Sequence, residues 1–246
     1  MTRVAVVGAA GRMGSETCRA VEAAPDLTLV SRVDFGDDLE AGLASVQVAI
    51  VFSTPEVAEE HVLACVSRGV HAVVGTTGWT AEALDRVQMA LRQAPSIGVL
   101  VAPNFALGAV LLMRFAAQAA AHYESVEIIE LHHPNKIDAP SGTARHTAEL
   151  VSSARQAAGR PPMPDATTTA LEGARGALVE GVPVHSVRLR GLVAHEEVLL
   201  GNPGEQLTLR HDSFERASFM PGVLLGVRKV PSRPGLTVGL ENYLDM

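Results

Sequence analysis

The chain has 246 residues, enough for one large domain or two smaller ones, and 47% of them are hydrophobic, which is sufficient for a sizeable core. Lysine and arginine number 20 against 27 aspartates and glutamates, so the net charge of −7 argues against nucleic acid or an anionic membrane as partner. No apolar run reaches the roughly 18 residues of a membrane span, the first strand follows the N-terminus without a signal-peptide pattern, and the two cysteines are typical of a reducing compartment, so we expect a cytoplasmic protein.

The chain begins with a pattern typical of dinucleotide binding. A short apolar strand, 3–7, leads into the turn Gly8-Ala-Ala-Gly-Arg-Met-Gly14, a helix continues to about Ala24, and a second strand, 26–33, ends at Asp34. Glycines let the backbone approach a pyrophosphate, which then lies on the helix N-terminus. The spacing is G-x-x-G-x-x-G rather than G-x-G-x-x-G, so the prediction of a dinucleotide site rests equally on the strand–turn–helix–strand setting.

The alternation of strands and helices then continues. Apolar strands are predicted over 46–52, 70–74 and 97–101, with helices beginning at Pro55 and after Thr80. Two of these strands end in polar or glycine-containing turns, Gly75-Thr-Thr-Gly78 and Ala102-Pro-Asn-Phe105. Ligands of an open parallel sheet lie beyond the carboxyl ends of its strands, so both turns join the first glycine turn as candidate binding segments.

The pattern changes after Phe105. A long helix is predicted over 107–121, a half-exposed strand over 126–131, and a second helix from Ser141 to about Ala158. A long irregular connection, 159–185, precedes strands over 184–192 and 195–200 and a turn at 201–204. The segment 206–211 is predicted to pair back as a hairpin, and a helix over 214–230 is interrupted or begun at Pro221-Gly222.

One stretch, Glu130-Leu-His-His-Pro-Asn-Lys-Ile-Asp-Ala-Pro-Ser-Gly-Thr-Ala144, concentrates chemically active side chains. His132 and His133 can exchange protons near neutral pH, and Lys136 adds a positive charge. Ser141 is typical of an N-cap, and free N–H groups at a helix start attract anions. These features favour a site for a small carboxylate substrate that must be protonated. The alternative interpretation is a polar surface loop entering an ordinary helix.

Two possible metal motifs are weaker. His61 and Cys65 lie four residues apart on one predicted helix, but no further ligands converge on them in the sequence, so packing is the favoured interpretation and no metal is expected. The segment from His195 to Leu199 reads H-E-E-V-L rather than H-E-x-x-H, which excludes a zinc-protease motif.

The segments quoted above resemble the 4-hydroxy-tetrahydrodipicolinate reductase family, long called dihydrodipicolinate reductase. The resemblance extends from the glycine turn through the Glu130–Ala144 stretch to Arg233-Pro-Gly-Leu-Thr-Val-Gly-Leu240. It implies an α/β protein in which a Rossmann-like, parallel-sheet dinucleotide-binding domain, 1–105 and 215–246, reclaims the C-terminal tail. It also implies an α+β mixed-sheet domain, 106–214, for substrate binding and assembly into a homotetramer.

The resemblance also implies roles for individual residues. His132 and Lys136 would be catalytic, as proton donors or acceptors, and His133 would contact a cyclic imine substrate that bears two carboxylates. Ser141, Gly142 and Thr143 would hold a substrate carboxylate, with Thr77 close to both ligands. The cofactor-binding residues would be Gly8, Ala9, Ala10, Gly11, Arg12, Met13, Asp34, Gly75, Thr76, Thr77, Ala102, Pro103, Asn104 and Phe105.

The cofactor would be NADH, NADPH or both. Asp34 can accept hydrogen bonds from the ribose hydroxyls of NAD but would repel a 2′-phosphate unless a cation is near. The residues after Asp34 are Phe35 and Gly36, so Arg12 is the most plausible such cation. We therefore expect NADH to be used at least as well as NADPH.

Two alternatives remain beside the family assignment. One is another dinucleotide-dependent enzyme acting on a small imino or amino acid, such as an aspartate dehydrogenase. The other is a non-catalytic nucleotide sensor, which would have no need of His132 and Lys136 beside a helix start.

Overall fold

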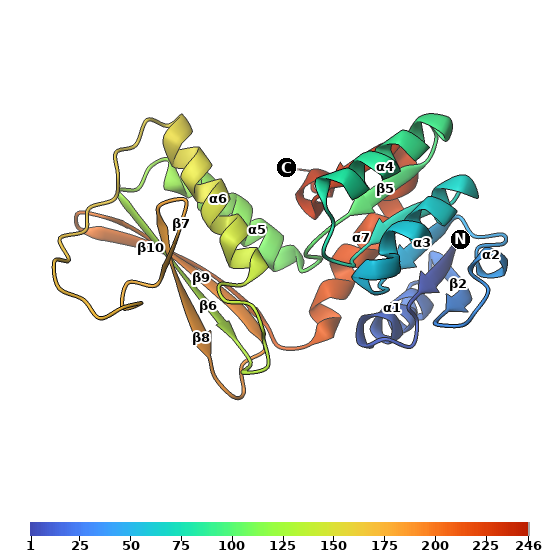
Figure 1. The fold of residues 1–246 in the computed structure, drawn as a ribbon, viewed down its shortest axis with the longest axis horizontal. Helices are drawn as coiled ribbons and strands as arrows, with labels where there is room; N and C mark the ends of the chain where they lie inside the picture. Colours follow the sequence, from blue (N-terminus) through green and yellow to red (C-terminus); the bar gives the residue numbers. More distant parts are fainter. Residues whose placement is uncertain (246) are drawn as a thin grey trace. The chain divides into compact units, whose positions relative to one another are not determined.

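The structure, a computed structural model, describes residues 1–245 as two compact units (Figure 1). The first unit comprises Met1–Ala106 together with Arg216–Met246, and the second comprises Leu107–Glu215. The first unit is therefore assembled from two separate stretches of the chain, and the second is a continuous segment between them.

The first unit is built on a six-stranded sheet with the strand order β11-β5-β4-β3-β1-β2, in which every neighbouring pair is parallel. Its strands are β1 (Thr2–Val7), β2 (Leu27–Val33), β3 (Val48–Val51), β4 (His71–Val74), β5 (Gly98–Val101) and β11 (Gly235–Val238). Its helices are α1 (Arg12–Ala23), α2 (Leu39–Gly42), α3 (Pro55–Ser67), α4 (Ala81–Gln93) and α7 (Met220–Lys229), with short 3-10 turns η1 (Arg216–Phe219), η2 (Val230–Ser232) and η3 (Leu240–Tyr243).

Helices cover both faces of this sheet. On one face, alternate strand residues such as Val51 and Val74 pack in a core with Val62 of α3 and Val87 of α4. On the other face, α1 and α7 are in contact with each other. Gly226 of α7 packs so closely on the sheet that an added Cβ would lie 3.0 Å from Leu100. The central strands are therefore buried on both faces, as their continuous apolar sequences predict.

Because all six strands are parallel, their carboxyl ends lie at the same edge of the sheet. Strand order reverses between β1 and β3, because β2 extends the sheet on one side of β1 and the later strands extend it on the other. The turn that begins at Gly8 follows β1 and lies at this switch point, where open α/β sheets bind their ligands. The edge thus collects the three segments selected from the sequence.

The second unit is a five-stranded mixed sheet with the order β10-β9-β6-β8-β7. Its elements are α5 (Leu107–Ala120), β6 (Ser125–His132), α6 (Gly142–Ala157), β7 (Ala177–Val179), β8 (Val182–Arg188), β9 (Ala194–Asn202) and β10 (Glu205–Ser213). The central strand β6 runs parallel to β8 and antiparallel to β9. Helices α5 and α6 pack against each other and against the sheet (Figure 1).

Alternation along β6 divides the side chains of the second unit between two faces. Val126 and Ile128 lie in a core with Ala144 and Ala148 of α6 and Leu112 of α5. Because successive side chains of a strand point to opposite faces, residues 130 and 132 lie on the helix-covered face, and residues 127, 129 and 131 lie on the other.

The structure differs from the predicted elements in five places. The C-terminal strand β11 was not predicted, nor were the short elements α2 and β7. Strand β8 ends at Arg188 instead of continuing to residue 192, because the chain turns through Gly191 with φ of 98°. The helix predicted over 214–230 is a 3-10 turn followed by α7, which starts at Met220 with Pro221 in its first turn. Pro221 lacks an N–H, so it fits the first turn of a new helix better than a helix interior.

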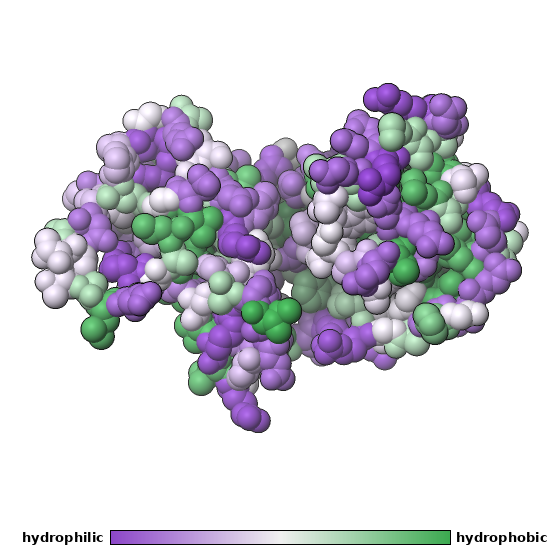
Figure 2. All heavy atoms as spheres, viewed as in Figure 1, coloured by the Kyte–Doolittle hydropathy of each residue, from purple (hydrophilic) through white to green (hydrophobic). Residues whose placement is uncertain are grey.

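No helix within residues 1–245 combines the length and apolar character that crossing a membrane requires. On the face of the molecule in Figure 2, hydrophilic residues are interspersed with smaller hydrophobic patches.

Candidate functional site

The glycine turn of the first unit is shaped by close backbone packing. Gly8 has φ of 82°, and a Cβ on it would lie 2.5 Å from the carbonyl oxygen of Phe52. A Cβ on Gly14 would overlap the carbonyl oxygen of Gly8, so α1 can pack this tightly on β1 only with glycine there. Gly11 is the N-cap of α1 and no side chain caps the helix, so the N–H groups of its first turn are available to an anion.

Asp34 lies directly beside this turn. Its Oδ2 accepts a hydrogen bond from the backbone N–H of Ala10 at 2.5 Å, and its Oδ1 accepts one from the N–H of Phe35 at 2.8 Å. These two hydrogen bonds lower the pKa of Asp34, so the carboxylate is charged at neutral pH. A cavity of about 540 Å³ opens beside it, lined by residues that include Gly8, Gly11, Asp34, Phe52 and Thr54. The turn, the acid and the cavity fit the adenosine and pyrophosphate portions of a dinucleotide.

The other two predicted cofactor segments lie at the ends of neighbouring strands. After β4, Gly75 packs against the ring of Phe52, and the hydroxyl of Thr76 is buried and donates to Ser53 O at 3.1 Å. Thr77 is exposed and lines a small pocket of about 190 Å³. After β5, the side chain of Asn104 accepts a hydrogen bond from the N–H of Ala106 at 2.9 Å.

In that last segment, Ala102 and Phe105 are buried whereas Pro103 is exposed. The rings of Phe105 and Phe52 meet edge to face at 6.1 Å. The side chains of Phe52 and Phe105 therefore pack beneath these turns, and Thr77 is left accessible to solvent.

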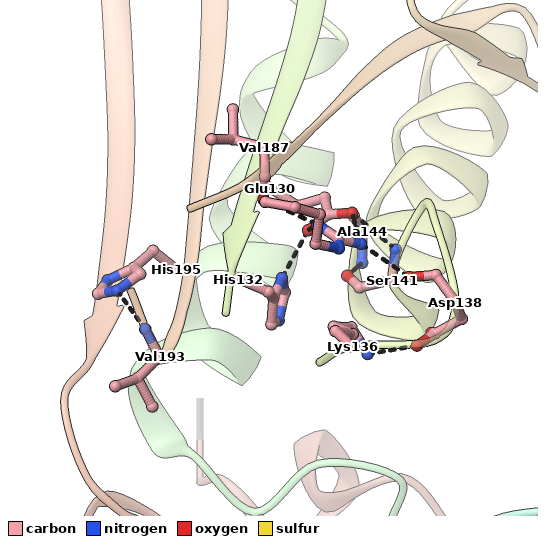
Figure 3. Close-up of polar contacts among 10 residues, drawn as sticks. Glu130, His132, Lys136, Asp138, Ser141, Ala144, Val187, Val193 and His195 are labelled. Atoms are coloured by element: carbon pink, nitrogen blue, oxygen red, sulfur yellow. Dashed lines mark hydrogen bonds and ion pairs between the residues drawn. The ribbon is translucent and has the colours of Figure 1, made fainter. Parts of the chain in front are cut away.

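The predicted proton-transfer residues gather where β6 ends and α6 begins (Figure 3). His132 is the last residue of β6, and its side chain is 14% exposed. Lys136 lies in the following loop and donates a hydrogen bond to Asp138 Oδ1 at 2.6 Å. His133 is exposed, and within residues 1–245 its ring has no hydrogen-bond partner.

Ser141 is the N-cap of α6, as predicted: its hydroxyl accepts a hydrogen bond of 3.2 Å from the backbone N–H of Ala144. Gly142 is exposed, and a Cβ on it would meet open space. Burial acts to raise the pKa of Asp138, but the Lys136 ammonium and, more weakly, the N–H of Gly142 outweigh it and lower that pKa. The lysine and the first N–H of the helix therefore converge on one carboxylate.

Sequence reasoning missed two residues of this cluster, Glu130 and Arg188. Glu130 has a fully buried side chain, to which Arg188 donates two hydrogen bonds, of 2.7 and 2.8 Å. The two acids of β6, Glu127 and Glu130, are an odd number of residues apart and so lie on opposite faces of the sheet. Counting that parity would have placed Glu130 with Ile128 in the core, where an ionised acid needs a partner.

Cys65, one of the two residues considered as a metal pair, is fully buried. Burial raises the pKa of the Cys65 thiol to about 12, which disfavours the thiolate a metal would need. In the part of the chain from 1 to 245, no three His, Cys, Asp or Glu side chains gather as a metal site requires.

Two sequence profiles of one protein family together cover most of the chain. The profile described as dihydrodipicolinate reductase, N-terminus, matches residues 2–105, and the one described as dihydrodipicolinate reductase, C-terminus, matches residues 108–244. The second profile continues into α7 and β11, which pack with the first unit.

Relatives that match this chain over nearly their whole length are described as 4-hydroxy-tetrahydrodipicolinate reductases. The 4-hydroxy-tetrahydrodipicolinate reductase of Beutenbergia cavernae is 62% identical over 244 residues, covering 99% of both chains. That of Streptomyces griseus is 60% identical over 245 residues, covering 99% of this chain and 98% of its own.

Among solved structures, the dipicolinate-bound dihydrodipicolinate reductase from Paenisporosarcina sp. TG-14 superimposes with a TM-score of 0.90 at 40% identity, covering 99% of this chain and 100% of that one. An amine dehydrogenase from Mycobacterium smegmatis, at 13% identity and a TM-score of 0.64, shares the fold alone.

Proposed function

The chain belongs to the dihydrodipicolinate reductase family, which consists of oxidoreductases of lysine and diaminopimelate biosynthesis, and from this premise we propose how its two units divide the reaction. The first unit binds NADH or NADPH. The second unit binds 4-hydroxy-tetrahydrodipicolinate, a cyclic imine with two carboxylates, and protonates it to give tetrahydrodipicolinate.

The cofactor is held at the carboxyl edge of the parallel sheet. The turn Gly8–Met13 binds the pyrophosphate through the free N–H groups at the start of α1, and Asp34 binds the adenine ribose. The segments Gly75–Thr77 and Ala102–Phe105 hold the nicotinamide end. When bound, the reduced nicotinamide supplies the hydride.

The substrate carboxylate is bound at the start of α6. The observation that carries this proposal is the convergence of the Lys136 ammonium and the Gly142 N–H on the carboxylate of Asp138, because it marks a position where this unit stabilises one carboxylate. Ser141 and Thr143 flank that position, and His133 and Thr77 provide further contacts to the substrate.

Protonation follows from the neighbouring groups. Hydride addition to the conjugated C=C–C=N system of the substrate leaves a carbanion-like carbon, which must take up a proton. His132 and Lys136 lie at the end of β6 and in the loop after it, beside the anion position. We assign the delivery of that proton to this pair.

The second unit is also the assembly unit. The face of its sheet opposite α5 and α6 has no covering helix of its own unit and carries half-buried apolar residues, among them Ile129, Leu131 and Leu199. We propose that this face joins four copies of the chain into a homotetramer.

A direct assay tests the proposed reaction. Purified protein is mixed with freshly synthesised 4-hydroxy-tetrahydrodipicolinate and either NADH or NADPH, and loss of the absorbance of the reduced cofactor is followed. We expect loss of this absorbance with the imine, and no gain of it when aspartate and oxidised cofactor are supplied instead. Turnover of aspartate but not of the imine would favour an aspartate dehydrogenase. Turnover of neither substrate would contradict the proposed reaction.

A further inference from the structure

The side chain of Glu130 is 0% exposed and lies in the core of the second unit. It follows Ile128 by two residues on β6 and precedes His132 by two, so all three lie on the face covered by helices. Strand β8 places Arg188 opposite His132 in register, and the same strand places Ser186 opposite Glu130. The sheet thus brings an acid, a histidine and an arginine together from two neighbouring strands.

Both oxygens of Glu130 accept a hydrogen bond from Arg188, and each has one further partner (Figure 3). Oε2 lies 2.5 Å from Nδ1 of His132 and accepts a hydrogen bond of 2.8 Å from Arg188. Oε1 accepts a hydrogen bond of 2.7 Å from Arg188 and one of 3.2 Å from the backbone N–H of Ser141. One carboxylate therefore contacts both the predicted proton donor and the first residue of the predicted carboxylate cradle.

We propose that Glu130 is a positioning residue for the reduction, holding His132 with a hydrogen on Nδ1 so that Nε2 is the nitrogen that exchanges a proton with the substrate. This inference rests on the proposed function, in which His132 delivers a proton. In the transfer, Nε2–H gives its proton to the carbanion-like carbon, the hydrogen on Nδ1 stays there and remains hydrogen-bonded to Glu130, and Nε2 is reprotonated from solvent.

The electrostatic surroundings keep Glu130 charged for this role. Burial acts to raise its pKa, but hydrogen bonds from His132, Arg188 and Ser186 outweigh burial and hold the pKa at about 2. The other charged or titratable groups facing the pair are Glu196 from β9 and Lys136 and Asp138 from the loop before α6. Glu130 is therefore ionised throughout the pH range of an assay.

The first test uses the wild-type protein without any substitution in the core. Imidazole nitrogen chemical shifts distinguish the two neutral tautomers of histidine, and the His132 signals are identified by their loss in His132→Asn. At a pH where the ring is neutral, we expect the hydrogen on Nδ1. A hydrogen on Nε2 would overturn the proposal whatever the activity of the protein.

The second test separates positioning from a merely structural role through the pH profile. In Glu130→Gln the imidazolium loses the neighbouring negative charge that stabilises it, so the alkaline fall in kcat should move to lower pH by about one unit. We also expect kcat at the optimum to fall by about 10²-fold, the lower end of what general acid–base catalysis contributes. The KM for the imine should change much less than kcat.

Glu127→Gln is the matched control. Glu127 lies on the same strand and also contacts a histidine and an arginine, His185 at 2.7 Å and Arg175 at 2.5 Å, but on the opposite face of the sheet. This variant should keep the wild-type pH profile. An unshifted profile in Glu130→Gln, or an equal shift in Glu127→Gln, would overturn the positioning role.

The two tests also separate this inference from the proposed reaction. A wild-type protein that does not reduce the imine would refute the reaction, and the tautomer of His132 would still be measured. If Glu130→Gln does not fold, the tautomer measured on the wild type decides the inference alone.

Discussion

Two cations, Lys136 and Arg12, differ sharply in their surroundings. Lys136 is 22% exposed and paired with Asp138, in a loop tied to the core because the carbonyl of Asp138 accepts a hydrogen bond from Arg188. Arg12 is exposed at the start of α1, and within residues 1–245 its guanidinium has no ion-pair partner. Lys136 is therefore held by an ion pair, whereas the guanidinium of Arg12 is accessible to a ligand.

Replacement of Lys136 tests its part in protonation and carboxylate binding. We expect Lys136→Ala to lower kcat by ~10² to 10⁴, the usual contribution of a general acid, with cofactor affinity nearly unchanged. Lys229→Ala, which removes the only other lysine of the chain, is the control and should keep full turnover. Steady-state kinetics and cofactor titration measure both effects. If the Lys136 variant retained most of its turnover, the residue would have no place in the mechanism.

Replacement of Arg12 tests cofactor choice. The charged Asp34 favours the ribose hydroxyls of NADH and repels a 2′-phosphate, so NADH should be used at least as well as NADPH. We expect NADPH to be tolerated through the guanidinium of Arg12, so Arg12→Ala should lose activity with NADPH alone. The measurement is kcat/KM with each cofactor. A wild-type preference for NADPH above about tenfold, roughly 1.4 kcal/mol, would contradict the assignment of Asp34.

At the scale of elements, the pairing of β6 with β9 sets two buried acids side by side. Glu130 and Glu196 are opposite each other in register, and both are buried. Burial, aided by the charge of Glu130 and only partly offset by a hydrogen bond with Thr147, raises the pKa of Glu196 to about 7, while that of Glu130 is about 2. One acid is therefore ionised and paired, and the other is mostly protonated below neutral pH.

The raised pKa predicts how Glu196 affects stability. Between the ordinary glutamate value of 4.5 and about 7, the unfolded chain ionises Glu196 but the folded chain does not. Rising pH over this window should therefore decrease the free energy of unfolding, by about 3 kcal/mol in all at roughly 1.4 kcal/mol per unit of pKa. Glu196→Gln removes this dependence. The Tm of the variant minus that of the wild type should therefore increase as pH rises from 4.5 to 7.

Glu197→Gln is the control, because Glu197 is the next residue on β9 and pairs with Arg210 on the other face. Its Tm difference from the wild type should stay nearly constant over the same range. A Glu196→Gln variant whose advantage did not grow with pH would show that Glu196 is already ionised in the folded protein.

The sequence predicted most elements of the first unit because each is defined by neighbours along the chain. Apolar runs, Pro55 and the cap at Thr80 fix the strands and helices from β1 to β5 without reference to distant residues. Strand β11 was missed because Gly235–Val238 is short and gains its partner only by pairing with β5, more than 130 residues earlier in the chain. Its pairing is a property of the fold and not of its own pattern.

The candidate site was predictable in part for the same reason. His132, Lys136 and Ser141 lie within ten residues of each other, and the cap at Ser141 is a local signal. Glu130 was within that stretch but was not selected, since its role depends on Arg188, which reaches it from β8. Nothing in the local sequence around Arg188 indicates that its partner lies 58 residues away.

At the scale of the whole molecule, the uncovered face of the sheet in the second unit determines the expected assembly. Ile129 and Leu131 of β6 and Leu199 of β9 are half-buried there, next to the charged pair Glu127 and Arg175. A mixed apolar and charged face of this kind is suited to an interface between copies.

Light scattering during size-exclusion chromatography tests this assembly. The wild type should have four times the mass of one chain. Leu199→Lys places a charge in the middle of the face and should lower that mass. Val30→Lys, which changes a residue 44% exposed on β2 of the first unit, should leave it unchanged. A monomeric wild type, or a tetrameric Leu199→Lys variant, would locate the interface elsewhere or exclude it.

The division of the first unit into two stretches of chain also orders events on the ribosome. Residues 107–215 leave the exit tunnel before α7 and β11 do, so the second unit has all of its strands outside the ribosome while the first still lacks its last one. Until Gly235–Val238 emerges, β5 is the edge strand of the sheet, and the side of Val99, Leu100 and Val101 that later pairs with β11 is unpaired. The nascent protein therefore completes the unit proposed to bind the substrate earlier than the unit proposed to bind the cofactor.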